Sequence, residues 1–161
     1  MFWSRRAIAV TGLLSLASFL PGPAAQAAEV QGFGNCGPLV IQRVLVTGCS
    51  ALPCTFVKGN TYEVRVTFLP DLSSNDITLT TSAQLPVGGQ ITLSQAKGAD
   101  IGLPTVTAGQ SATFTRNFEV PALDPPHTGT ERWNLTGGGE GTLACFDLPV
   151  NVRSNSLVGD L

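Results

Sequence analysis

The 161-residue chain is poor in charge, in histidine and in long apolar runs. Only 12% of its residues are charged, and they form no polybasic patch, which argues against nucleic acid as a partner. The single histidine, His127, and the absence of a Cys-x-x-Cys pair argue against a metal site, so we expect neither a metal nor another cofactor. After residue 27, no apolar run is long enough to span a bilayer.

The first 27 residues have the composition of a secretory signal peptide. Arg5 and Arg6 form a basic start, residues 7–20 are apolar, and Ala25-Gln26-Ala27 supplies small residues for cleavage. We expect cleavage after Ala27 and a secreted product, or one in the lumen of a lysosome or vacuole. A membrane anchor is the alternative, but the apolar stretch is short for one.

The remaining chain has the length of one domain. Two of the nine basic residues lie in the signal segment, which leaves seven basic residues against eleven acidic ones. We expect a single domain over residues 28–152, a flexible tail over residues 153–161, and a monomer.

The rest of the chain is patterned for strands rather than helices. Runs with a period of two recur between turn signals, which predicts an all-β sandwich or barrel. In the clearest run, Val64, Val66 and Phe68 share one face. The runs predict about seven strands, at residues 39–47, 62–68, 77–83, 91–93, 114–120, 133–135 and 146–152.

The glycine-rich stretch at residues 137–141 has the composition of a phosphate-binding loop. It lacks the Gly-Lys-Ser/Thr ending, and no helix-like segment follows it. A hairpin turn between the strands of Trp133 and Phe146 is the better interpretation.

Four cysteines in an exported chain predict two disulfides, with three possible pairings. We favour Cys49–Cys54 together with Cys36–Cys145, because Pro53 lies in the short loop between Cys49 and Cys54 and holds its two ends together.

Several linked motifs resemble the ML lipid-recognition family over residues 33–152. In chain order they are Asn35-Cys36-Gly37-Pro38, Cys-x4-Cys at 49–54, Lys-Gly-x-x-Tyr-x-Val-x-Val-x-Phe at 58–68, and Cys-Phe-x-Leu-Pro-Val at 145–150. The family includes soluble cholesterol carriers, mite group 2 allergens and fungal phosphatidylglycerol or phosphatidylinositol transfer proteins. The motifs are most similar to those of the cholesterol carriers.

The resemblance implies an immunoglobulin-like β-sandwich of two antiparallel sheets that splay apart and hold an apolar lipid in the gap. It implies the disulfides Cys36–Cys145 and Cys49–Cys54. A third family disulfide has no counterpart in residues 95–104, which lie near the pocket mouth in relatives, so we expect that segment to be less constrained here.

The resemblance also implies pocket positions, each of which has an ordinary core position as its alternative. The implied lipid-binding residues are Val64, Val66, Phe68, Phe114, Phe118, Val120, Trp133, Phe146 and Leu148. Two departures from the family, Glu119 in place of a proline and the polar stretch at residues 128–132, leave both a sterol and a phospholipid open as the ligand.

Two further positions have expectations of their own. Asn134 begins the glycosylation sequon Asn-Leu-Thr and should be exposed on the face opposite Trp133. Arg116 is in phase with Phe114 and Phe118, so alternation points it inward. A bulge could turn it outward, an acid such as Glu131 could pair with it, or it could lie at the pocket mouth and face an anionic head group.

The sequence therefore predicts a lipid-binding and transfer protein that makes transient contact with membranes. An enzyme is one rival, although no Ser-His-Asp set surrounds His127 and no cysteine is left unpaired as a nucleophile. The other rival is a structural or adhesion sandwich, which would have a filled core and no ligand.

Overall fold

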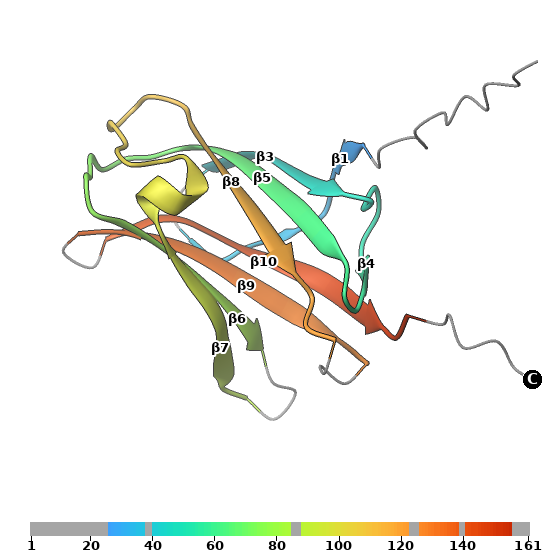
Figure 1. The fold of residues 1–161 in the computed structure, drawn as a ribbon. Coiled ribbons are helices and arrows are strands. Elements are labelled where there is room, and N and C mark those ends of the chain that lie inside the picture. Colours follow the sequence, from blue (N-terminus) through green and yellow to red (C-terminus); the bar gives the residue numbers. More distant parts are fainter. Residues whose placement is uncertain (1–25, 38–39, 85–87, 123–125, 139–140, 156–161) are drawn as a thin grey trace, which may run out of the picture.

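The computed structural model describes residues 26–37, 40–84, 88–122, 126–138 and 141–155. They form two sheets that face each other (Figure 1). The first sheet has the order β1-β3-β5-β8, with β1 at Ala27–Glu29, β3 at Val40–Thr47, β5 at Thr61–Leu69 and β8 at Ala112–Glu119.

The second sheet has the order β2-β10-β9-β6-β7, and β4 also pairs with β10. Its strands are β2 (Gly34–Asn35), β10 (Thr142–Arg153), β9 (His127–Gly137), β6 (Ile77–Gln84), β7 (Gln90–Lys97) and β4 (Cys54–Val57). A short 3-10 helix, η1 (Gly98–Ile101), follows β7. The edge strands β7 and β8 thus belong to different sheets.

The expected all-β sandwich is confirmed, but the count of seven strands is wrong, because the described residues form ten. All seven predicted strands are present, most of them longer than expected. The three additions are β1, β2 and β4, which are two to four residues long and too short to show alternation. One pair, β4 with β10, is parallel rather than antiparallel.

The ends of the chain need one correction. Arg153 is not part of a tail, since it ends β10, pairs with Val57 of β4, and accepts a hydrogen bond from the Lys58 amide through its carbonyl oxygen. The signal segment up to residue 25 lies outside the described residues. The described residues contain no helix that is long and apolar enough to cross a membrane.

The filled core consists of the inward-facing residues of both sheets. On β5, Val64, Val66 and Phe68 have no exposed surface, and Phe114 of β8 lies beside Phe68 with the ring centroids 6.3 Å apart. The facing sheet supplies large apolar side chains such as Leu79 and Leu135, which are paired across β6 and β9. Burial of these side chains is the main stabilising contribution to the sandwich.

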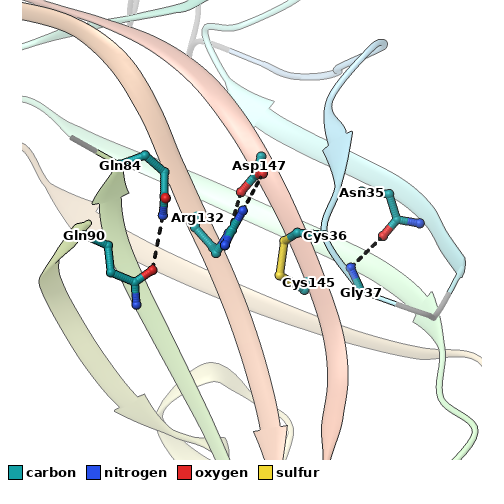
Figure 2. The surroundings of a disulfide bond; sticks show 8 residues. All are labelled: Asn35, Cys36, Gly37, Gln84, Gln90, Arg132, Cys145 and Asp147. Carbon is teal, nitrogen blue, oxygen red and sulfur yellow. Dashed lines mark hydrogen bonds and ion pairs between the residues drawn. A yellow bond between two sulfur atoms is a disulfide. The ribbon is translucent and has the colours of Figure 1, made fainter. Parts of the chain in front are cut away.

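The disulfide Cys36–Cys145 fastens the segment after β2 to β10 (Figure 2). Asn35 accepts a hydrogen bond from the Gly37 amide through Oδ1, which turns the chain at Cys36. A Cβ on Gly37 would lie 3.1 Å from the Cβ of Cys145, so glycine suits this close approach. The Asn-Cys-Gly motif is thereby explained by the geometry of the disulfide.

The second disulfide, Cys49–Cys54, joins the end of β3 to β4 around a loop with a cis Leu52–Pro53 peptide. Both predicted pairings are therefore confirmed, and the described part of the chain contains no free cysteine.

Residues 95–104 are fixed by packing rather than by the third disulfide of the family. Ile101 and Leu103 are buried, and the Leu103 amide donates to the Gly98 carbonyl at 2.7 Å. A Cβ on Gly98 would collide with the Leu103 carbonyl, so the tight turn requires glycine. Packing and a tight turn therefore hold this segment, and the expectation that it is less constrained than in the family stays a prediction.

We predict that the long-range disulfide contributes more stability than the local one. The two bonds join residues 109 and 5 positions apart. In the chain-entropy model, loops of these lengths correspond to about 4–5 and about 2 kcal/mol of unfolding free energy. Urea denaturation of Cys36→Ala/Cys145→Ala and of Cys49→Ala/Cys54→Ala measures both values, and the reverse ranking would contradict the prediction.

Candidate functional site

A cavity of about 540 Å³ lies between the two sheets at one end of the sandwich. It is found where β8 and β6 end and where β7 and β9 begin. The first sheet supplies β8 to its wall, and the second sheet supplies β6, β7, β9 and Val152 at the end of β10. The edge strands β7 and β8 both border it.

The cavity exists because the inward-facing side chains of β6 and β9 become smaller or more polar along the sheet. Leu79 pairs with Leu135 and fills the core, but four residues further along β6 Ala83 pairs with Glu131, and Gly129 follows on the same face of β9. Facing sheets lie about 10 Å apart, a gap that alanine and glycine cannot bridge. At this end of the sandwich the inward-facing side chains of β6 and β9 are therefore too small to fill the space between the two sheets.

Three of the nine predicted lipid-binding residues line the cavity: Phe118, Val120 and Trp133. The structure places the other six outside its wall, all of them buried in the filled core: Val64, Val66, Phe68, Phe114, Phe146 and Leu148. They point inward as expected. In this part of the sandwich, however, side chains of the opposite sheet already fill the space between the two sheets.

Aromatic contacts hold the inner end of the cavity in place. Trp133 of β9 meets Phe118 of β8 edge to face, with centroids 5.7 Å apart, and stacks on Phe146 at 5.9 Å with an interplanar angle of 16°. Phe118 is also supported by Phe56 of β4 at 5.3 Å. Phe146 thus supports the wall from behind. Phe56 was missed because β4 is too short to show alternation.

The wall also carries polar side chains that we did not predict as site residues. Thr81 and Ser94 are joined by a hydrogen bond between their hydroxyl oxygens at 2.6 Å. Glu131 is only 9% exposed and has an interaction partner of its own. Alternation carried a signal for two of these residues, because Thr81 is in phase with Leu79 and Glu131 with Trp133.

Arg116 lies on the cavity wall, so the alternative in which a bulge turns it outward is wrong. The pairing of β8 with β5 is regular, and Arg116 is opposite Val64. None of the ion pairs found among the described residues involves Arg116. Its Nε is buried without a hydrogen-bond partner, as is Nε1 of Trp133.

These two unpartnered nitrogens lower the stability of the folded protein. A buried donor that loses its hydrogen bond costs about 1–3 kcal/mol, and more when the group is charged. A molecule in the cavity with an acceptor group could reduce that cost. The arrangement can therefore bind a largely apolar molecule and offers it polar side chains as well.

The outer face of the second sheet is separate from this cavity. Arg132 of β9 donates two hydrogen bonds of 2.9 Å to the Asp147 carboxylate of β10 (Figure 2). The hydrogen bond to Asp147 raises the pKa of Arg132 above its ordinary value, so this guanidinium stays charged at any physiological pH. The described residues contain no group of three potential metal ligands.

The exposure predicted for Asn134 is wrong. This residue lies in the middle of β9, opposite Thr80 of β6 and Cys145 of β10, and its neighbours leave it half-buried. Its Oδ1 is fully buried and has no partner. Use of the sequon stays a prediction.

No family model matches the sequence. It is nevertheless similar to curated proteins named NPC intracellular cholesterol transporter 2. The dog protein (Canis lupus familiaris) is 26% identical over 153 residues, which cover 92% of this chain and 99% of the relative. The cattle protein (Bos taurus) is 26% identical over 141 residues, which cover 84% of this chain and 94% of the relative.

Solved structures share the fold. A Niemann-Pick type C2 protein from the Japanese carpenter ant superposes with a TM-score of 0.68 at 14% identity, over 76% of this chain and 99% of that one. Chicken MD-1, solved in complex with lipid IVa, superposes with a TM-score of 0.54 at 14% identity. The superposition covers 77% of this chain and 95% of the MD-1 chain. Together with the cysteine and strand motifs, these comparisons confirm the resemblance to the ML family: the chain has the β-sandwich fold of a Niemann-Pick type C2 protein and is similar in sequence to proteins of that name.

Proposed function

We propose that the chain binds a lipid in the cavity between its two sheets and carries it between membranes. The observation that supports this most is the unfilled space itself. At about 540 Å³ it falls within the range of roughly 300–1,000 Å³ that is typical of small-molecule sites. A structural or adhesion sandwich would have side chains in this space.

The chemistry of the wall suits a lipid. Phe118, Val120 and Trp133 line it from within, and Ile91 and Leu93 line it from the edge strand β7. Burying about 350 Å² of apolar ligand surface would contribute roughly 9 kcal/mol before the entropic cost of association. Such an affinity is compatible with reversible carriage and requires no catalytic group.

The edge of the sandwich offers a route for transfer. Ile91 and Leu93 are 53% and 50% exposed although they also line the cavity. Large exposed apolar side chains at the border of a cavity can contact a membrane while a lipid enters or leaves. We therefore keep transient membrane contact as part of the proposal.

The relatives support carriage over catalysis, because their names describe cholesterol transporters and MD-1 was solved with lipid IVa. A sterol and a phospholipid are the two candidate ligands from the resemblance. They differ chiefly in the head group that polar side chains on the wall would meet. Two disulfides suit an oxidising compartment, which supports secretion or a lysosomal or vacuolar destination.

We predict that Ala83→Phe blocks lipid uptake. Ala83 lies on the cavity wall, and an added phenyl ring takes up about 150 Å³, the size of a cavity that holds benzene. Uptake of a fluorescent sterol and of a fluorescent fatty-acyl probe should weaken at least tenfold. If the chain begins at Ala28, Trp133 is its only tryptophan, so energy transfer from Trp133 reports occupancy of this cavity.

Ala99→Phe is the matched control, since Ala99 is exposed on η1 and does not line the cavity. It should bind both probes like the unmodified chain. Equal uptake by a folded Ala83→Phe variant would contradict binding in this cavity.

We predict that two phenylalanines of β8 affect different properties, one of them lipid binding and the other the stability of the fold. Phe118→Ala removes about 50 Å² of wall contact, or about 1.3 kcal/mol, and should weaken lipid binding nearly tenfold. Phe114→Ala should instead lower the unfolding free energy by about 3–5 kcal/mol and leave the Kd of the folded protein unchanged, because Phe114 is 1% exposed in the filled core. Paired urea denaturation and binding titrations separate the two effects. A loss of binding confined to Phe114→Ala would contradict the assignment of the wall.

A further inference from the structure

The size of the cavity limits what it can enclose. A cavity of about 150 Å³ holds benzene, which has six non-hydrogen atoms, so each atom needs roughly 25 Å³. A cavity of about 540 Å³ therefore encloses roughly 20 non-hydrogen atoms. One long acyl chain with a small head group has about this size. A two-chain phospholipid has at least twice as many atoms and would have to leave much of its apolar surface outside.

The polarity of the cavity indicates what the head group should be. Arg116 reaches the wall from the regular part of β8, and its Nε lacks a partner. The other sheet contributes the hydroxyls of Thr81 and Ser94 to the same wall. Their mutual hydrogen bond uses only one of the two O–H groups, so that bond leaves the other O–H to donate elsewhere.

The remaining charged or titratable groups on the wall are Glu119, His127 and Glu131. Glu119 and His127 are exposed, and both Glu131 and His127 have partners of their own. Glu131 is paired with Ala83, two residues along β6 from Thr81. Arg116 is therefore the permanent positive charge of the cavity wall.

Resting on the proposed function, we propose that Arg116 binds the anionic head group of a single-chain lipid, with a long-chain carboxylate as the simplest such cargo. A guanidinium donates two parallel hydrogen bonds to a carboxylate or a phosphate, a geometry that neither a sterol hydroxyl nor an ester can match. The acyl chain then lies against Phe118, Val120 and Trp133. Charge recognition by Arg116 thus adds to the burial of the apolar chain.

Equilibrium binding of radiolabelled hexadecanoate and of its uncharged methyl ester tests this on the purified secreted protein. The two probes share one chain and differ in the head group. We expect the acid to bind at least tenfold more tightly than the ester, since hydrogen bonds to charged groups are the stronger ones. Arg116→Gln should remove this preference by weakening acid binding alone. Arg116→Lys, which keeps the charge without the planar fork, should retain part of the preference.

Arg65→Gln is the matched control. Arg65 lies on the neighbouring strand β5, is exposed, and pairs with Glu63 at 2.9 Å outside the cavity. This variant should keep the full preference for the acid. Circular dichroism and urea denaturation establish that each variant is folded before its binding is compared.

Three outcomes would overturn the proposal and leave lipid carriage intact. The first is that Arg116→Gln keeps the full preference for the acid, and the second is that the unmodified protein binds acid and ester equally. The third is that it binds diacyl phosphatidylglycerol more tightly than hexadecanoate. Displacement of hexadecanoate by acetate or inorganic phosphate at similar concentrations would also overturn it, because the site would then recognise the anion alone. Failure of the unmodified, folded protein to bind any of these lipids would instead refute the proposed function itself.

Discussion

The contact between Trp133 of one sheet and Phe118 of the other marks the boundary between the filled core and the cavity. On one side of it the two sheets are filled by large apolar side chains, among them Phe146, which stacks on Trp133. On the other side the inward positions hold alanine, glycine and polar residues, which cannot close the gap between sheets. The two rings therefore lie where the core ends and the cavity begins. The disulfide between Cys36 and Cys145 links the segment after β2 to β10, directly beside Phe146.

Alternation predicted an all-β sandwich or barrel, and the resemblance to the ML family narrowed this to a sandwich of two sheets. The short loop with Pro53 and the same resemblance predicted both disulfides. Val64, Val66 and Phe68 show why the site was harder to predict. A period of two tells which side chains point inward, but whether an inward side chain meets a neighbour or a cavity depends on the residues of the other sheet at the same level. That level follows from the stacking of the two sheets, which one strand's pattern does not contain. Asn134 illustrates the same limit, since its burial depends on Thr80 and Cys145 in the adjacent strands.

The polar groups of the wall make the cavity different from a purely apolar one. An unpartnered guanidinium nitrogen lowers the stability of the empty protein, and a ligand that supplies an acceptor offsets this cost. Alternation alone points Arg116 inward, and the regular register of β8, without a bulge, explains why it lies on the cavity wall. The role of the segment after β7 was predicted less well. Ile101 and Leu103 of that segment are buried, and the segment does not line the cavity.

The proposed function requires that a lipid occupies the space between the two sheets. Native mass spectrometry of the purified protein, before and after extraction with organic solvent, tests it most directly. The predicted result is one small amphiphile bound per chain, lost on extraction, identified in the extract and regained when lipid is added back. A protein that carries no lipid mass as purified, and that gains none when sterols, fatty acids or phospholipids are supplied to the folded chain, would contradict it.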